Sequence, residues 1–321
     1  MINKKRYREF CKEEVSIPIF SQSWWLDSVC GVDNWNVIII ENNGNIMATM
    51  PIYFKKINSF NVITMPKLTQ NMGIYIKYPK SQKYSSKLSF EKKIINSIIE
   101  QLPKVDRFSQ NFHYSFNNWL PFFWSGFIQS TNYTYVIENL QLYSLDDILQ
   151  NFSSSYRNKI KKAKKLVNIG FDLDIKSFYD INMKTFDRQG VKRPYSLDFL
   201  ISHDSVLEDN KSKKIFYAFD TTDQIHSALY LTWDHTSSYV HMVGEDPNLR
   251  NSGAGILLIL EAIKYTKEVL KLNIFDFEGS MLENVEQVRR DCGGIQKPYF
   301  IISKTNSKLL VLKNAIKKII K

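Results

Sequence analysis

The sequence predicts an α/β (α+β) fold of mixed, mostly antiparallel sheets flanked by helices, repeated in two tandem domains. Three observations support this prediction. Residues 36–54 and 215–233 each have the pattern strand, turn, strand. Each half of the chain also has an amphipathic helical stretch before its hairpin and a strand–helix–strand stretch after it. Finally, 321 residues, of which 44 % are apolar, suit two domains with cores of their own.

The two predicted hairpins can be aligned without a gap. When their turns are superposed, Glu41 falls on Asp220 and Ile46 falls on Ile225, with the same offset in both cases. The first turn reads Asn-Asn-Gly-Asn, which is typical of tight β-hairpins. We interpret the chain as two copies of one α/β unit, over residues 1–140 and 141–321.

The remaining elements follow from periodicity and from turn residues. Residues 144–166 predict one helix, because apolar residues recur at helical spacing and Ser144 with Asp147 forms a plausible N-terminal cap. In the first domain we further expect a strand-like stretch at 65–76, a helix at 88–101 and strands at 105–112 and 132–137. In the second we expect helices at 177–189, 254–270, 282–291 and 306–320, and strands at 215–220, 225–233, 238–243, 273–277 and 298–303.

Charge and cysteine content limit the class of protein. The formal net charge of +11 favours anionic partners such as nucleotides, tRNA, phospholipid headgroups or CoA phosphates, without choosing among them. Cys11, Cys30 and Cys292 are scattered, and no metal-ligand spacing is present, so we expect no metal. With no signal peptide or membrane-spanning stretch evident, we expect a cytoplasmic protein.

A glycine-containing turn is the sharpest chemical feature of the chain. It has the form R-x-x-G-x-G and lies between a predicted strand and an apolar helix. Backbone N–H groups at such a helix N-terminus can bind a diphosphate, and an arginine adds a charge-assisted contact. The alternative is a purely mechanical turn that lets the helix pack on the sheet. The expected donor-binding residues are Arg250, Asn251, Ser252, Gly253, Ala254 and Gly255.

With this turn, several stretches resemble the two-domain, FemABX-like and BioF2-like branch of the GNAT N-acyltransferase superfamily. The stretches are FSQSWWLDSV, SSSYRNKIKKAKK, TFDRQG and FDFEGSMLENVEQVRRDCGG followed by KPYF. The resemblance implies a degenerate GNAT-like N-terminal domain and a C-terminal GNAT domain that holds the donor. It also implies transfer of an acyl group from CoA, or of an amino acid from aminoacyl-tRNA, to an amine. The chain lacks the tyrosine acid of simpler GNAT enzymes in ENVEQVRRDCGG, which leaves the general acid open.

Candidate catalytic groups lie at the ends of two predicted strands. Asp276 and Glu278 are expected on one face of a strand that runs into Gly279, where carboxylates could orient or deprotonate an attacking amine. His241 and Glu245, on the strand before the glycine turn, are alternative bases. The simpler alternatives are a solvated polar strand face and a structural histidine.

Candidate substrate-binding residues rest mainly on the resemblance. Arg157 matches an arginine in the S-x-R segment and could clamp a phosphate, and its neighbour is Tyr156. Further candidates for the acceptor groove are Arg188, Gln189, Gln70 and Asn71. For Lys161 and Lys162, on the same predicted helix as Arg157, we favour a basic, solvated helix face over a binding role.

Three functions remain open at this level. The first is an N-acyltransferase that uses acyl-CoA, such as acetyl-CoA, and an amino-sugar or lipid-linked cell-envelope acceptor. The second is a Fem-type transferase that uses aminoacyl-tRNA, and the third is a non-catalytic basic module for nucleic acid or membrane. The tail at 307–321 is amphipathic and basic, with Leu309, Leu312, Ile316 and Ile320 on one stripe; it either packs on the protein or docks peripherally to an anionic membrane.

Overall fold

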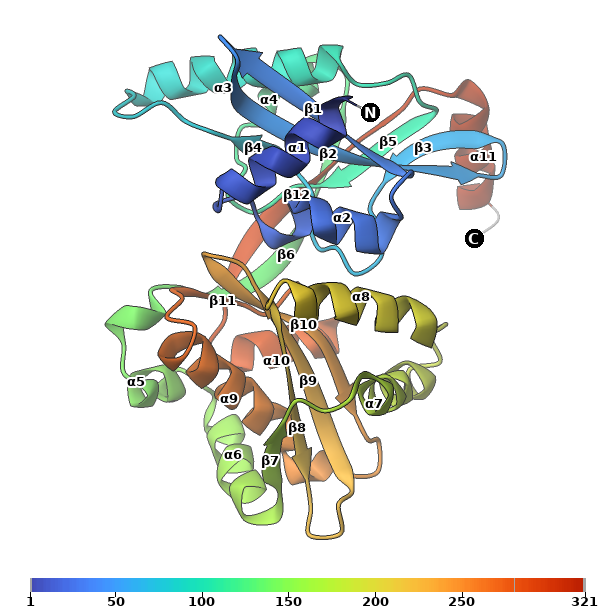
Figure 1. Ribbon diagram of the computed structural model, residues 1–321. Coiled ribbons are helices and arrows are strands. Elements are labelled where there is room, and N and C mark those ends of the chain that lie inside the picture. Colours follow the sequence, from blue (N-terminus) through green and yellow to red (C-terminus); the bar gives the residue numbers. More distant parts are fainter. Residues whose placement is uncertain (1, 280, 320–321) are drawn as a thin grey trace. The chain divides into compact units, whose positions relative to one another are not determined.

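A computed structural model describes residues 2–279 and 281–319, with only the backbone for Ile2 and for residues 314–319. The chain divides into two compact units (Figure 1). Unit 1 comprises residues 1–132 and 298–321, and unit 2 comprises residues 133–297. The division places the C-terminal segment 298–321 with the first half of the chain, whereas the sequence suggested domains at 1–140 and 141–321.

Unit 1 is built on an antiparallel meander followed by a parallel pair. The sheet order is β1-β2-β3-β5-β12, with β4 beside β2 and a parallel pairing between β3 and β5. The elements are α1 (Ile2–Glu13), the 3₁₀ turn η1 (Ile19–Ser21), α2 (Ser23–Cys30), β1 (Trp35–Asn42), β2 (Asn45–Ile57), β3 (Phe60–Thr64), β4 (Tyr75–Ile76), α3 (Tyr84–Glu100), β5 (Arg107–Asn111) and α4 (Leu120–Trp124). The helix α3 buries Ile94, Ile95 and Ile98 in the core of this unit.

Unit 2 repeats the same plan. Its sheet order is β7-β8-β9-β10-β11-β6, with antiparallel neighbours except for the parallel pair β10 and β11. The elements are η2 (Leu140–Leu142), α5 (Leu145–Gln150), α6 (Ser154–Leu166), β7 (Asn168–Phe171), α7 (Ile175–Arg188), α8 (Leu197–Asp209), β8 (Lys213–Phe219), β9 (Ile225–Trp233), β10 (Ser237–Glu245), η3 (Arg250–Ser252), α9 (Ala254–Glu268), β11 (Ile274–Asp276) and α10 (Glu283–Asp291). In Figure 1, α7 and α8 cover one face of the sheet, and α6 and α9 cover the other.

The two units therefore share a common plan, although β7, the edge strand beside β8, has no counterpart beside β1. The crossover helix α3 joins the parallel strands of unit 1 as α9 joins those of unit 2. Each sheet ends on a strand from a distant part of the chain, because β12 (Ile295–Thr305) pairs with β5 and β6 (Ile128–Ile137) pairs with β11. This confirms the tandem α/β fold with mostly antiparallel strands, and it explains why the C-terminal segment belongs to unit 1.

Both predicted hairpins form. The first turn has Asn43 and Gly44 at φ +51° and +79°, the geometry that an Asn-Gly hairpin turn requires. In the second, the Asp220 carboxylate accepts the backbone N–H groups of Thr222 and Gln224, so that one side chain closes the turn.

Several boundaries differ from the sequence prediction. The expected helix at 144–166 is two helices, α5 and α6, because Ser153 starts a new helix by accepting the N–H of Tyr156. The capping box between Ser144 and Asp147 is present as predicted. Of the stretch 65–76 only β4 is a strand. The helices α1 and α2 lie in the helical stretch expected before the first hairpin, for which no bounds were predicted, whereas α4, α8, β3 and β7 had no sequence prediction.

The last helix, α11 (Lys308–Ile319), lies where a tail helix was predicted. Its Leu309 and Leu312 side chains are 71 % and 59 % exposed. The side chain of Ile316, like those of Lys317 and Lys318, lies outside the described residues, as do Ile320 and Lys321. None of the helices within residues 2–279 and 281–319 has the length and apolarity that crossing a bilayer would require.

Candidate functional site

The parallel strands of unit 2 separate at the point where the candidate carboxylates lie. Strand β10 pairs with β11 only over residues 237–239 and 274–276, and beyond this point it continues to Glu245 paired with β9 on its other side. His241 lies at a register shift in β10, between Val240 and Met242. Such a β-bulge re-aims a side chain and is frequent beside functional sites.

Local geometry determines the position of Glu278. Strand β11 ends at Asp276, so Glu278 is not on the strand face that periodicity suggested. Its φ of +48° is unusual for a residue with a side chain. The Asp276 carboxylate accepts the Glu278 N–H at 2.8 Å and stabilises this turn. At Gly279 a Cβ atom would lie 1.9 Å from the Tyr133 carbonyl oxygen, so only glycine allows the chain to pass.

Glu278 and His241 form a hydrogen-bonded pair. Oε1 of Glu278 lies 2.9 Å from Nδ1 of His241. The His241 side chain is 1 % exposed and that of Glu278 is 17 % exposed, so the carboxyl is the more accessible member. Burial lowers the pKa of His241 to about 3 and raises the pKa of Glu278 well above the usual carboxyl range. The pair therefore favours uncharged forms, with the carboxyl O–H donating to Nδ1.

Asp276 is more deeply enclosed than Glu278. It is 1 % exposed, and its Oδ1 accepts the Thr134 hydroxyl at 2.6 Å. Burial raises the pKa of Asp276 to about 7, while the hydrogen bond from Thr134 opposes the shift. Because Oδ1 of Asp276 accepts hydrogen bonds from both the Thr134 hydroxyl and the backbone N–H of Glu278, Asp276 stabilises the turn that carries Glu278.

Arg289 is the basic partner of this cluster, and the sequence reasoning did not single it out. It lies on α10, with its guanidinium carbon 5.8 Å from the centre of the Phe277 ring. Burial lowers its pKa, and the charges of Glu278 and Asp276 oppose this shift. The sequence feature that could have indicated Arg289 is its position four residues before the Gly293-Gly294 turn. A Cβ at Gly294 would lie 2.8 Å from the Arg289 carbonyl oxygen.

The loop 250–255 lies between β10 and α9, as predicted. At least one of its glycines is needed for backbone conformation and close packing. Gly253 has φ +80°, and a Cβ there would lie 2.8 Å from the Lys159 carbonyl oxygen on α6. The N–H groups of Ser252 and Gly253 donate to Leu249 and Arg250 carbonyls, and that of Ala254 donates to the Ser252 hydroxyl. The Asn251 carbonyl accepts Lys162 Nζ at 2.7 Å.

A carboxylate of the protein itself lies at the entrance to α9. Oε2 of Glu245 is 2.7 Å from Nε of Arg250, the residue expected to bind a donor phosphate. Oε1 of Glu245 would be 3.3 Å from a Cβ at Gly255, in the first turn of the helix. A helix N-terminus stabilises a negative charge in this position. Here that charge belongs to Glu245.

Two further predicted residues lie on α6. Tyr156 is 8 % exposed, and burial raises its pKa to about 12, with Cys292 and Glu245 among the neighbouring groups that add to the shift. The Arg157 guanidinium donates to the carbonyls of Gln150 and Phe152, at the end of α5. Arg157 therefore has a helix-capping role in this structure.

The other predicted substrate residues lie on elements other than those that carry the Glu278 cluster. Arg188 is the last residue of α7 and Gln189 is its C-cap, and both are exposed. Gln70 and Asn71 lie in unit 1 between β3 and β4; the Gln70 carbonyl accepts Asn111 Nδ2 at 3.1 Å, and Asn71 is 5 % exposed.

A second histidine, absent from the sequence prediction, lies beside His241. His203 is on α8, fully buried, and its ring centre is 5.9 Å from that of His241. Burial lowers its pKa well below the ordinary value. Because the helix at 197–209 was not predicted, sequence reasoning could not bring this residue to the site.

The cluster can perform proton transfer. It combines a partly accessible carboxyl of raised pKa, a neutral imidazole that orients it, a buried second carboxyl and the half-buried guanidinium of Arg289. In the part of the chain that the structure describes, no group of three or more His, Cys, Asp or Glu side chains is arranged to hold a metal ion.

Comparison with known proteins identifies the domain. The Acetyltransferase (GNAT) domain model matches residues 150–283. The crystal structure of FemX is similar with a TM-score of 0.67 at 11 % identity, covering 94 % of this chain and 96 % of that one. L-PGS from Bacillus licheniformis is similar with a TM-score of 0.53 at 10 % identity, covering 98 % and 96 %. A conserved protein of unknown function from Bacteroides thetaiotaomicron has a TM-score of 0.57 at 11 % identity, covering 94 % and 97 %.

No curated protein sequence matches the chain significantly. The domain match covers the strands and helices that carry Asp276, Glu278 and His241, and the structural similarities extend over both units. Residues 150–283 therefore match the Acetyltransferase (GNAT) domain, and the fold of the chain as a whole is similar to that of FemX.

Proposed function

We propose that the protein transfers an acyl group from an activated ester or thioester to an amine, with Glu278 accepting the proton of that amine. The observation that carries the proposal is the Glu278–His241 pair, placed where β10 and β11 separate. In open sheets, ligands bind beyond the carboxyl ends of such strands. The GNAT domain match supports a transferase of this kind.

The chemistry follows from the environment of Glu278. An amine is protonated at neutral pH and becomes nucleophilic only after it loses a proton. Burial raises the pKa of Glu278 well above the usual carboxyl range, so in its ionised form this carboxylate is a stronger base than one on the surface. The amine nitrogen then forms a bond to the acyl carbon, the bond from that carbon to sulfur or oxygen breaks, and the leaving thiolate or alkoxide takes up the second proton, which the nitrogen loses as the amide forms. His241 and Asp276 position Glu278 throughout.

The first donor candidate is acyl-CoA, with its diphosphate at residues 250–255. Support comes from the position of this loop, directly after β10 and at the N-terminus of α9. Binding requires Glu245 to leave the helix entrance and Arg250 to exchange its carboxylate partner for a phosphate.

The second donor candidate is aminoacyl-tRNA. The specific observation in its favour is the Glu245–Arg250 pair, because a carboxylate at the helix entrance repels a diphosphate. The fold shared with FemX adds to this, since the Fem resemblance implies aminoacyl transfer. The lysines of α6 offer a positive surface to a polyanion.

The acceptor class rests on the resemblance alone. We propose an amine on an amino sugar or on another cell-envelope precursor, free or lipid-linked. Arg188, Gln189, Gln70 and Asn71 remain proposed acceptor contacts. A cytoplasmic enzyme with peripheral contact at the inner face of the membrane would suit a lipid-linked acceptor.

Thermal melting with separate ligands tests the proposal. Acetyl-CoA, CoA and bulk tRNA are added to the full chain, because a ligand that binds only the folded state raises the midpoint. Heparin serves as a control for non-specific polyanion binding. A rise with CoA compounds supports the first donor, and a rise with tRNA beyond that with heparin supports the second. If none of them raises the midpoint, the transferase proposal fails.

A further inference from the structure

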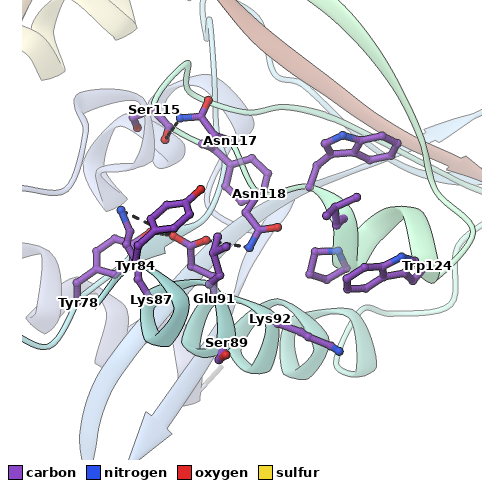
Figure 2. A pocket seen from close by; sticks show the side chains of 15 residues that line it. Tyr78, Tyr84, Lys87, Ser89, Glu91, Lys92, Ser115, Asn117, Asn118 and Trp124 are labelled. Atoms are coloured by element: carbon purple, nitrogen blue, oxygen red, sulfur yellow. Dashed lines mark hydrogen bonds and ion pairs between the residues drawn. The ribbon is translucent and has the colours of Figure 1, made fainter. Parts of the chain in front are cut away.

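Unit 1 contains a pocket that none of the candidate catalytic residues enters. Its volume is about 510 Å³, within the usual range for small-molecule sites. It is lined by residues of α3, of α4 and of the loop that precedes α4, together with Tyr78 between β4 and α3 (Figure 2). Because all of these segments belong to unit 1, the pocket is a feature of that unit alone.

A buried carboxylate forms the polar centre of the pocket. Glu91 on α3 is 8 % exposed, and it accepts hydrogen bonds from the Tyr78 hydroxyl at 2.8 Å and from Asn118 Nδ2 at 2.9 Å (Figure 2). Lys87 Nζ lies 3.9 Å from the same carboxylate. A carboxylate has about four acceptor positions. Glu91 is therefore held rigidly and keeps acceptor capacity for a ligand.

Aromatic rings that face solvent surround this centre. Tyr84 is 75 % exposed and Trp124 is 59 % exposed, although both line the pocket. Exposed aromatic side chains gathered around a concave polar site are typical of binding sites rather than of a core. The negative faces of such rings attract polarised C–H groups or cations.

The charge of the rim favours an anion. Lys92 Nζ lies 5.0 Å from the centre of the Trp124 ring, and it forms no ion pair with any residue that the structure describes. Lys87 Nζ lies 4.6 Å from the centre of the Tyr78 ring and partly neutralises Glu91. A ligand cation would meet two ammonium groups, whereas an anionic group beside Trp124 would meet one available charge.

We propose that this pocket binds a sugar residue that carries an anionic group, either a carboxylate or a phosphate. The axial C–H face of a pyranose would stack on Trp124 or Tyr84. Its hydroxyls would donate to Glu91 and exchange hydrogen bonds with the amide of Asn118, and its anionic group would pair with Lys92. The proposal does not depend on the transferase reaction, because it concerns binding without any donor.

Ligand-detected NMR on the full chain tests this proposal. The probes are methyl glucoside, glucuronate, glucose 1-phosphate, inorganic phosphate and adenosine monophosphate. We expect saturation transfer to the two anionic sugars, weaker transfer to methyl glucoside, and no displacement of either anionic sugar by inorganic phosphate at equal concentration. The comparison of glucuronate with glucose 1-phosphate shows whether the site binds a carboxylate or a phosphate more tightly.

Two pairs of variants locate the binding. Trp124→Ala should weaken binding about tenfold, whereas Tyr143→Ala, which removes an exposed ring in unit 2, should leave it unchanged. Lys92→Gln should remove the preference for anionic over neutral sugar, and the adjacent exposed Lys93→Gln should not. Because these side chains are exposed, the variants should fold, and melting curves verify this.

Several results would overturn the inference. These are absence of binding to every sugar, equal binding by the Trp124→Ala variant, equal competition by inorganic phosphate, and binding of adenosine monophosphate in preference to the sugars. None of them bears on the donor experiment, so failure here leaves the proposed transferase function intact.

Discussion

Nδ1 of His241 lies 2.9 Å from Oε1 of Glu278, which links the bulge in β10 to the turn that follows β11. The two strands pair only up to Tyr239 and Asp276, so this hydrogen bond is made just beyond the last paired residues. It places a carboxyl of raised pKa at the separation of the strands and holds it in one orientation. The proposed chemistry depends on this relationship.

Replacing Glu278 by glutamine should remove the proton acceptor while keeping the shape of the site. We expect the rate of acyl transfer to fall by about 10²–10⁴-fold, the usual contribution of a general base. The loss should shrink at alkaline pH, where the amine is already deprotonated. In the wild-type protein the rate should rise with pH up to a value well above the ordinary carboxyl pKa. The measurement is a pH–rate profile with whichever donor the melting experiment identifies.

Glu283→Gln is the matched control, because Glu283 is an exposed glutamate in the first turn of α10. It should leave the profile unchanged. If Glu278→Gln retains the wild-type rate at neutral pH, another group accepts the proton and the assignment of Glu278 is wrong.

Replacing Asp276 by asparagine should change how stability depends on pH. The pKa of Asp276 is about 7 in the folded protein, above its ordinary value of 3.8. Between these values the folded state binds more protons than the unfolded state, so this group makes the free energy of unfolding fall as pH rises. The stability of the variant relative to wild type should therefore increase from about pH 4 to pH 7 and then stay constant. The full difference is on the order of 4 kcal/mol.

Urea unfolding at a series of pH values gives this difference directly. The comparison with wild type is needed because the lowered pKa of His241 acts in the opposite direction over part of the range. Asparagine retains an oxygen that can accept from Thr134 and from the N–H of Glu278. Parallel stability curves for the two proteins would show that Asp276 ionises normally.

Much of the fold could be predicted because it depends on residues that are close together in the sequence. The Asn-Gly turn and the capping box of Ser144 with Asp147 each depend on side chains close in sequence, and both form as expected. The exchange of β12 into unit 1 depends on pairing between Ile301–Thr305 and Arg107–Asn111, which no local pattern records. The break between α5 and α6 was missed because apolar spacing continued across Ser153.

The site was less predictable than the fold. Glu278, Asp276 and His241 were named from their places near strand ends, but the bond between Glu278 and His241 needs a bulge and a positive φ that periodicity does not show. Arg289 was missed because the sequence does not distinguish an arginine on an exposed helix from one that lies near buried carboxyl groups. Only the packing of α10 shows that Asp276 and Glu278 are its neighbours. The Glu245–Arg250 pair was missed because glycine spacing says nothing of which anion occupies a helix entrance.

Replacing Gly279 by alanine should disturb the site through the backbone. The added Cβ would lie 1.9 Å from the Tyr133 carbonyl oxygen, so the turn must move. We expect a loss of about 2–3 kcal/mol in the free energy of unfolding, as for other overpacked sites, together with loss of transfer activity. Gly44→Ala is the control, because Gly44 has φ +79° and open space around it. It should lose only about 1–2 kcal/mol from backbone strain and keep its activity.

Replacing Glu245 by glutamine should decide what the loop 250–255 binds. The change removes the carboxylate that pairs with Arg250 while preserving side-chain size. If this helix entrance is the diphosphate site, the affinity for acetyl-CoA should rise about fivefold, since one repulsive charge at a helix N-terminus is worth roughly 1 kcal/mol. Arg250→Ala should weaken the same binding.

The control for this prediction is Glu268→Gln, which removes an exposed charge at the other end of α9 and should have no effect. Calorimetric titration measures all four proteins, and unchanged or absent CoA binding in Glu245→Gln would assign the donor site elsewhere and favour aminoacyl-tRNA.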